Sequence, residues 1–168
     1  MDVLIVDSRE KWTQTANPRV AGHNVRDYFQ RHGIEYEVRK LDCGDYMYPG
    51  GKISVDRKGS LSEIATNLMN RSDSARFWRE VRRAKESGIQ LIVLIECGSQ
   101  YRSIRDVAAW KSKYSPVTGR VLMNEMTRAE YAYGVQFRFC DKRSTGKKIL
   151  ELLKEEQKEK QENLRTTE

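Results

Sequence analysis

The segment "IQLIVLIE", residues 89–96, is the clearest candidate for a buried β-strand in the sequence. Its apolar run does not alternate with polar residues, which is typical of a strand covered on both faces. A segment with helical periodicity, residues 74–87, precedes it and ends at Gly88. After it, residues 103–133 are predicted to be helical, with a break at residues 114–119. The strand is therefore the predicted centre of an α/β fold.

Other predicted strands and helices alternate along the rest of the chain. Four more segments have the apolar runs or the alternation of strands: "VLIVD" (3–7), "IEYEVRKL" (34–41, half buried), "ISVD" (53–56) and "VQFRFC" (135–140). One further helix is predicted to start at Asn17 and Pro18 and to end at Gly33. Two more are predicted over residues 60–68 and from Gly146 onward. The helix before Gly88 is predicted to be capped by Ser72 or Asp73. This order predicts a central mixed sheet flanked by helices on both faces.

Length and charge limit the classes of protein to which the chain could belong. A chain of 168 residues can bury one substantial core, so we expect one domain over residues 1–154 and a charged, solvated helical tail over residues 155–168. The formal net charge of +7 favours a polyanionic partner, with nucleic acid as the first candidate.

The cysteines and the hydropathy indicate a compartment. Cys43, Cys97 and Cys140 are far apart and lack the spacing of a zinc site or a disulfide framework. No apolar run approaches the length of a membrane span, and acids stand too early for a signal peptide. We expect a cytoplasmic protein of a bacterium or a phage-infected cell, or a nuclear one if the source is eukaryotic, with no membrane partner.

Charged residues gather where predicted strands end. On an extended strand Asp56 and Lys58 share one face, and a hairpin-like return could bring Asp45 beside Asp56. Asp7 and Glu96 each end an apolar strand, and sites in α/β sheets are built at the carboxyl ends of strands. Glu63 begins the helix that follows.

Converging carboxylates and one lysine have a chemical interpretation. Such carboxylates repel one another unless a cation lies between them, and Mg²⁺ or Mn²⁺ prefers oxygen ligands of this kind. A bound divalent ion makes a nucleophile of water, and Lys58 could orient that water or stabilise charge on a phosphate. The alternative is a solvated strand end, with Glu63 as an ordinary residue of the first helical turn.

Five blocks, in order, resemble one family of nucleases. They are "LIVDSRE" (4–10), "CGDY" (43–46), "VDRKGSLSEI" (55–64), "RFWREVRRAKESGIQLIVLIE" (76–96) and "FRFCDKRSTGKKILELLK" (137–154). Together they resemble the nuclease domain of XPF-type structure-specific endonucleases, a branch of the PD-(D/E)xK superfamily, in a compact form like phage or bacterial members. The resemblance implies a restriction-endonuclease-like fold.

The resemblance also implies a catalytic set. Asp7, Asp45 and Asp56 would be the metal-binding acids, Arg57 and Lys58 the basic pair of the ERKxxxD signature, and Glu63 its last acid. Two departures stand out, because Asp56 replaces a glutamate and four residues rather than three separate Lys58 from Glu63. Family members use Mg²⁺ or Mn²⁺ and cut branched DNA, in flaps, forks or Holliday junctions, during replication, recombination or repair. Homodimers and replication or recombination partners are expectations of the same kind.

Basic side chains outside this set are candidates for contact with DNA. Arg76, Arg79 and Arg83 lie on one side of a predicted helix, either as phosphate contacts or as a solvated face. Lys111 and Lys113 lie among aromatic residues, in a loop that could contact a single strand or be an ordinary connection around a buried tryptophan. Another candidate is Arg9, which could bind phosphate, orient Asp7 or form a salt bridge within its loop.

Two hypotheses of different class follow. The first is a metal-dependent endonuclease that hydrolyses branched DNA. The second is a non-catalytic DNA-binding or scaffolding subunit, because the family also contains inactive partners, although these typically lose the acids that are present here. An RNA-directed nuclease stays open, because no residue in the sequence is identified as reading the sugar.

Overall fold

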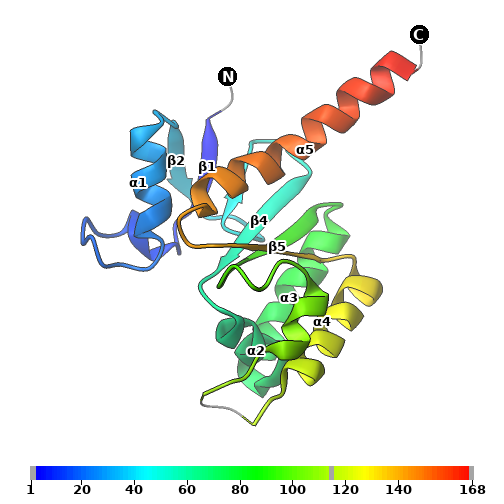
Figure 1. Ribbon diagram of the computed structural model, residues 1–168. Helices are drawn as coiled ribbons and strands as arrows, with labels where there is room; N and C mark the ends of the chain where they lie inside the picture. Colours follow the sequence, from blue (N-terminus) through cyan, green and yellow to red (C-terminus); the bar gives the residue numbers. More distant parts are fainter. Residues whose placement is uncertain (1–2, 114–115, 167–168) are drawn as a thin grey trace.

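The computed structural model describes residues 3–113 and 116–166, and a six-stranded mixed sheet is its centre (Figure 1). The strands lie in the order β2-β1-β3-β4-β5-β6. β1 runs parallel to β2 and antiparallel to β3, β3 is antiparallel to β4, and β4, β5 and β6 are parallel. Their bounds are Leu4–Asp7 (β1), Tyr36–Arg39 (β2), Tyr46–Met47 (β3), Ile53–Lys58 (β4), Gln90–Glu96 (β5) and Gln136–Cys140 (β6). Consequently β1, β4, β5 and β6 all end at the same edge of the sheet.

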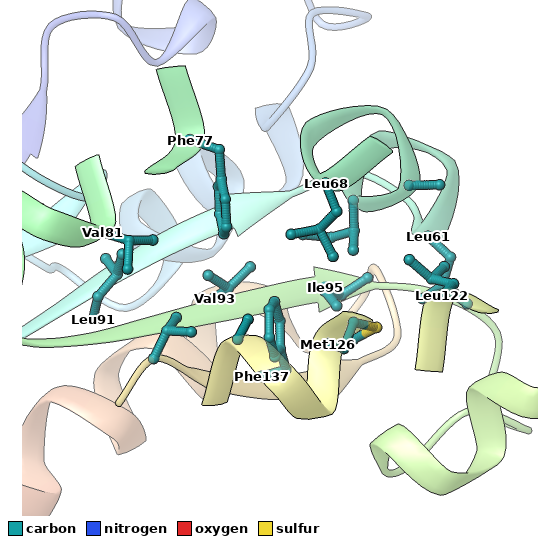
Figure 2. Close-up of a cluster of buried hydrophobic side chains, with 14 of the residues drawn as sticks. Leu61, Leu68, Phe77, Val81, Leu91, Val93, Ile95, Leu122, Met126 and Phe137 are labelled. Atoms are coloured by element: carbon teal, nitrogen blue, oxygen red, sulfur yellow. The ribbon is translucent and has the colours of Figure 1, made fainter. Parts of the chain in front are cut away.

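Helices cover one face of the sheet around β5, the strand that the sequence predicts at the centre of the fold. Alternate residues of β5, Leu91, Val93 and Ile95, are buried there against three helices (Figure 2). These are α2 (Leu61–Met69), α3 (Arg71–Glu86) and α4 (Gly119–Tyr133). A 3-10 helix, η2 (Ile104–Ala109), packs beside α4. The predicted break between the last two elements is confirmed, although its residues 114–115 lie outside the described residues.

The other face is covered by α1 (His23–Arg31) and α5 (Thr145–Thr166). Ile92 and Leu94 of β5 point into this second core, which α1 and the first turns of α5 complete. Because β5 contributes to both cores, the prediction of a strand buried on both faces is confirmed. The apolar stripe of α5 packs on the sheet of its own chain, through Ile149, Leu150, Leu152 and Leu153.

Two predicted helix starts were wrong, each because a side chain forms a different local hydrogen bond. Residues after Asn17 form turns, with the Arg19 N–H donating to Asn17 Oδ1 at 2.9 Å, and the helix begins only after Gly22. Gly22 has φ +84, outside the α-helical region, and a Cβ there would lie 2.6 Å from a Trp12 ring carbon, so the position requires glycine. For α3, Asn70 caps the helix, with Oδ1 accepting from the N–H of Ser72.

Two other details differ from the sequence prediction. The turn-rich stretch before β4 contains the two-residue strand β3, which was not predicted. β2 is an edge strand, and only Tyr36 within it is half-buried, whereas the alternation had predicted a half-buried strand. Val38 is 46% exposed. Neither difference changes the position of the sheet edge where the charges meet.

The end of α5 projects away from the sheet (Figure 1). Within residues 3–113 and 116–166, none of the helices is both long and apolar enough to cross a membrane. The division into a domain over 1–154 and a tail over 155–168 remains a prediction.

Candidate active site

A hollow of about 420 Å³ opens at the edge where β4 ends. It is lined by Arg9, Glu10, Lys11, Ala21, Asp45, Asp56, Arg57, Lys58, Gly59 and Glu63. Hollows of greater volume lie elsewhere, one of them about 580 Å³ beside Tyr131 and Tyr133 at the opposite ends of the strands. The smaller hollow is the one in which most of the predicted catalytic residues meet.

Asp45 and Asp56 lie next to each other, as the predicted hairpin-like return requires. The antiparallel pairing of β3 with β4 is extended by the Asp45 N–H, which donates to Val55 O at 2.8 Å. The Arg57 N–H then donates to Asp45 Oδ2 at 2.8 Å, which fixes this carboxyl group over the strand. Burial raises the pKa of Asp45 well above its ordinary value, and the neighbouring Asp56 carboxylate raises it further. The pair therefore carries an unfavourable concentration of negative charge.

Lys58 partly offsets this charge. Its Nζ lies 3.1 Å from Asp56 Oδ2, and only 13% of its side chain is exposed. Burial lowers the pKa of Lys58, but Asp56, Glu63 and Asp45 raise it by more, so the pKa lies above its ordinary value. Lys58 is therefore a cation at neutral pH, suited to binding anionic oxygen and not to accepting a proton.

Arg57 points to the other side of β4, as the alternation of a strand demands. Its Nε and Nη2 bind both oxygens of Glu10, at 2.9 and 3.0 Å, and its Nη1 binds Glu96 Oε1 at 2.8 Å. At most 9% of any of these three side chains is exposed. Arg57 thus lines the hollow, and its guanidinium group is fixed by hydrogen bonds to Glu10 and Glu96. Its predicted catalytic role stays a prediction.

Asp7 is bound by the loop that follows β1. Its Oδ1 accepts from Arg9 N–H at 2.7 Å and Nε at 2.8 Å, and its Oδ2 accepts from Arg9 Nη2 at 2.8 Å and Leu41 N–H at 2.9 Å. Burial raises the pKa of Asp7, but these hydrogen bonds outweigh it and hold the pKa below its ordinary value. Both oxygens therefore have donors within the chain, and Asp7 as a metal ligand remains a prediction. Arg9 orients Asp7 while 56% of its own side chain is exposed.

Glu63 is tied to the start of α2. Its Oε2 accepts from the Gly59 N–H at 2.7 Å, and its own N–H donates to the capping Ser60 Oγ at 3.1 Å. The side chain is exposed, yet it is near enough to Lys58 to raise the pKa of that lysine. The structure thus shows the first-turn role that the sequence left open and also places the acid beside the catalytic candidates.

Three acids of this edge, Glu10, Glu80 and Glu96, were not part of the predicted catalytic set. Glu80 of α3 accepts from the Gly44 N–H at 2.6 Å, and Asp56 is among the groups that raise the pKa of this glutamate, after burial. A signal existed, because residues 77, 80, 81 and 84 share one helical face and Glu80 is the acid among apolar neighbours. For Glu10 the contacts with Arg57 are joined by hydrogen bonds from Tyr46 Oη and Trp12 Nε1. No local pattern indicates that network.

The predicted DNA contacts lie on separate elements. Arg76 and Arg79 are exposed on α3, and Arg83 is exposed but donates through Nε to Asp42 O at 3.0 Å. Lys111 and Lys113 are exposed after η2, next to Trp110, which is buried in the core. Trp110 therefore serves as packing and not as a stacking platform, whereas the lysines remain available.

The donor set at the hollow fits a hard divalent cation. Asp56 Oδ2 is buried and accepts no hydrogen bond, although Lys58 lies beside it, and Asp45 adds a second carboxyl oxygen donor. Within the described residues, no three His, Cys, Asp or Glu side chains are grouped so that they could hold a metal ion by themselves. Mg²⁺ commonly binds one or two carboxylates and keeps several waters, so two carboxylates are sufficient donors for such an ion.

The comparisons with known proteins agree with this geometry. A family model described as the ERCC4 domain matches residues 6–153. The chain belongs to the ERCC4-domain family. Among solved structures, XPF from Aeropyrum pernix matches with 20% identity and a TM-score of 0.63, over 90% of this chain and 63% of that one. XPF from Aeropyrum pernix in complex with DNA matches with 20% identity and a TM-score of 0.66, over 94% and 66%.

This ERCC4-domain chain therefore spans somewhat less than two thirds of those XPF chains. The comparison with curated proteins gave no match. The predicted resemblance to XPF-type nuclease domains and the restriction-endonuclease-like mixed sheet are both confirmed.

Proposed function

We propose that this chain is a divalent-metal-dependent endonuclease that hydrolyses phosphodiester bonds in branched DNA. The carrying observation is the pair Asp45 and Asp56, two adjacent carboxyl groups with Lys58 Nζ 3.1 Å from the buried Asp56 Oδ2. Without a cation, two adjacent carboxylates lower the stability of the fold. If the pair had no function, one of the two acids would be expected to be replaced during evolution. Membership of the ERCC4-domain family supports the same chemistry.

In this proposal Asp45 and Asp56 hold the cation, which is Mg²⁺ or Mn²⁺. When bound, it would polarise a phosphoryl oxygen and lower the pKa of a coordinated water. The chain's own residues do the rest. The Arg57 N–H fixes the Asp45 carboxyl group, and protonated Lys58 presents a cation to a non-bridging phosphate oxygen, where it stabilises the charge that develops during hydrolysis.

Positive charge on the protein surface would attract the DNA backbone to this edge of the sheet. The sequence carries a formal net charge of +7, and Arg9, Arg76, Arg79, Lys111 and Lys113 all expose side chains to solvent. Phosphate contacts of this kind bind without sequence preference and weaken as salt rises. That one matched XPF structure is a complex with DNA supports DNA as the ligand. Pairing into homodimers and association with replication or recombination proteins belong to the same proposal.

The competing proposal is a non-catalytic DNA-binding subunit. It shares the basic surface but gives no role to the carboxylate pair beside Lys58. The substrate series therefore has to report cutting and binding separately. We propose flaps, forks, four-way junctions, plain duplex and an RNA flap, each incubated with Mg²⁺, with Mn²⁺ and with EDTA.

The decisive variants are Asp56→Asn and Lys58→Met. Each should lower the cleavage rate at least about 100-fold, Asp56→Asn because it removes a carboxylate that would hold the divalent cation, and Lys58→Met because it removes the positive charge facing the phosphate. DNA affinity measured by anisotropy in EDTA should change little. Matched controls are Asp27→Asn and Lys147→Met, exposed residues on α1 and α5.

The outcomes separate the two proposals. Wild-type cleavage of a branched substrate that is lost in Asp56→Asn and kept in both controls supports the endonuclease. Tight DNA binding by wild type without any cutting, in either metal, supports the scaffolding subunit instead. Undiminished cutting by Asp56→Asn would remove the assigned site. Preferential cutting of the RNA flap would reassign the substrate.

A further inference from the structure

Helix α3 is fastened to the loop that carries Asp45. Glu80 Oε1 accepts from the Gly44 N–H at 2.6 Å, and Arg83 Nε donates to Asp42 O at 3.0 Å. Glu80 and Arg83 are three residues apart, so they lie on one side of the helix, one turn from each other. The two contacts bind the loop over residues 42–45 to a rigid element that is itself packed in the core through Phe77, Val81 and Ala84.

The loop is a tight corner with little room for adjustment. Gly44 has φ +72, and a Cβ at this position would lie 2.0 Å from Ser54 Oγ. Only glycine fits such a conformation and such a close approach. On either side of the corner, Cys43 O accepts from Ser54 Oγ at 2.8 Å, and the Asp45 N–H donates to Val55 O at 2.8 Å. β4 therefore holds the flanks of the corner, and Glu80 holds its apex.

The length and chemistry of the Glu80 contact make it a strong one. A carboxylate that accepts from a backbone N–H forms a charge-assisted hydrogen bond, shorter and stronger than a neutral one, and 2.6 Å is short for this class. Glu80 is partly buried near Asp56, and both the burial and the negative charge of Asp56 disfavour its ionised form. The position of such an acid beside the loop of Asp45 therefore suggests a function for Glu80.

We propose that Glu80 is a positioning residue for Asp45, acting through its hydrogen bond with the Gly44 N–H. By fixing the Cys43–Gly44 peptide, one residue before Asp45, it limits the directions in which that carboxyl group can point. The part that concerns Asp45 as a cation ligand rests on the proposed endonuclease function, whereas the ordering of the corner does not. Outer contacts that orient a metal-binding side chain typically contribute 10- to 100-fold to metal affinity or activity.

The test compares Glu80→Ala with Glu80→Gln, because glutamine keeps an acceptor oxygen at the same place and loses only the charge. A matched control is Glu86→Gln, an exposed acid near the end of the same helix. Glu80→Met is a second variant, which fills the same space without an acceptor if alanine lowers stability. Each protein is first checked by thermal unfolding. Three quantities are then measured: hydrogen exchange at the Gly44 amide, Mn²⁺ affinity by calorimetry, and kcat and KM on a branched substrate.

The expected results follow from the hydrogen bond. Glu80→Ala and Glu80→Met should accelerate exchange at the Gly44 amide about 10-fold, weaken Mn²⁺ binding about 10-fold and lower kcat about 10- to 100-fold with KM little changed. Glu80→Gln should fall by less than Glu80→Ala in all three quantities, because it keeps the acceptor in a weaker, neutral hydrogen bond. Glu86→Gln should lie within about 3-fold of wild type, because it leaves the Glu80 contact intact.

Two results would overturn the assignment. If Glu80→Gln falls as far as Glu80→Ala in Mn²⁺ affinity, the charge of Glu80 matters and not its acceptor oxygen. If Glu80→Ala leaves both Gly44 exchange and Mn²⁺ affinity unchanged, the contact does not position the loop. Should wild type cut no substrate, the proposed function fails, while exchange at Gly44 and Mn²⁺ affinity still decide the role of Glu80.

Discussion

Asp45 and Asp56 show, at the scale of single residues, how function and stability oppose each other. Burial and the second carboxylate raise the pKa of Asp45 well above its ordinary value, which means that ionising it in the folded chain costs free energy. The chain offers partial compensation through the Arg57 N–H and Lys58. A divalent cation would supply the remainder.

Asp45→Asn should therefore stabilise the metal-free protein. We expect a gain of about 1 kcal/mol in the free energy of unfolding at pH 7 in EDTA, within the range of about 0.5–2 kcal/mol that single stabilising substitutions commonly give. Because the pKa of Asp45 is raised in the fold, its favourable contribution is complete below pH 3.8 and is lost as pH rises toward the folded pKa. The gain should therefore be largest near pH 7 and should disappear at pH 3.

Urea denaturation at pH 3, 5 and 7 measures this gain. Mn²⁺ should raise the stability of wild type and leave Asp45→Asn almost unaffected, since a ligand stabilises only a fold that binds it. A lower stability of the variant at pH 7 in EDTA would contradict the account, because it would mean that the ionised carboxyl group is favourable even without metal.

At the scale of elements, strand β4 separates two charge systems by its alternation. Asp56 and Lys58 face the side of α3, and Arg57 faces the side of α1, where Glu10 and Glu96 hold it. Both systems contribute to the lining of the hollow, but Arg57 pairs with two carboxylates and Lys58 with one. Replacing Arg57 and replacing Lys58 are therefore expected to destabilise the fold to different degrees.

Arg57→Met should destabilise the fold severely. It leaves two carboxylates, each less than a tenth exposed, without their cation, and breaking a buried pair in this way costs about 3–5 kcal/mol. Lys58→Met, one residue along, should cost less, because it leaves one carboxylate and not two without a cation. Urea denaturation at pH 7 compares the two. Adding Glu10→Gln and Glu96→Gln to Arg57→Met should restore part of the loss, and equal stability of both single variants would contradict the assignment.

These elements also show where sequence reasoning succeeds and where it stops. Strand alternation and the turn before β4 were enough to predict that Asp45 meets Asp56 with Lys58 beside it. The partners of Arg57 come from positions 39 and 47 residues away, and no local pattern encodes such pairings. The sequence indicates that Glu80 is an acid on an apolar helical face. It does not indicate the partner, Gly44, because that residue lies 36 residues away and meets Glu80 only through the packing of α3 against the loop. The predicted start of α1 was wrong for a local reason, because Asn17 Oδ1 accepts from the Arg19 N–H in a turn and does not cap a helix there.

At the scale of the whole molecule, the sheet order decides what the site can be. Because β3 is inserted antiparallel between β1 and β4, the two outer groups of parallel strands point the same way and their carboxyl ends meet at one edge. Helices on both faces then leave that edge as the place where charged side chains converge (Figure 1). Long-range topology of this kind was predicted only as a mixed sheet, and the antiparallel insertion itself was not predicted.

The contacts of α5 with the rest of the chain bear on the predicted boundary between the domain, residues 1–154, and the tail, residues 155–168. Among the side chains that the structure describes in α5, the last buried apolar one is Leu153, where the family match also ends, and Glu155 forms an exposed ion pair with Arg138 at 3.8 Å. Such pairs contribute about 0–1 kcal/mol. A chain that ends at Lys154 should therefore unfold within about 1 kcal/mol of the full chain and keep the proposed cleavage activity. Urea denaturation and the branched-substrate assay measure both quantities.

The control for this truncation is a chain that ends at Lys148. It loses Ile149, Leu150, Leu152 and Leu153, and removing even one such buried side chain costs about 2–5 kcal/mol, so this chain should not fold stably. Sedimentation of the two chains that fold reports whether residues 155–168 take part in self-association. If ending the chain at Lys154 costs more than about 2 kcal/mol, or changes the oligomeric state, residues 155–168 belong to the folded unit or to its interface, because exposed ion pairs cannot supply that much stability.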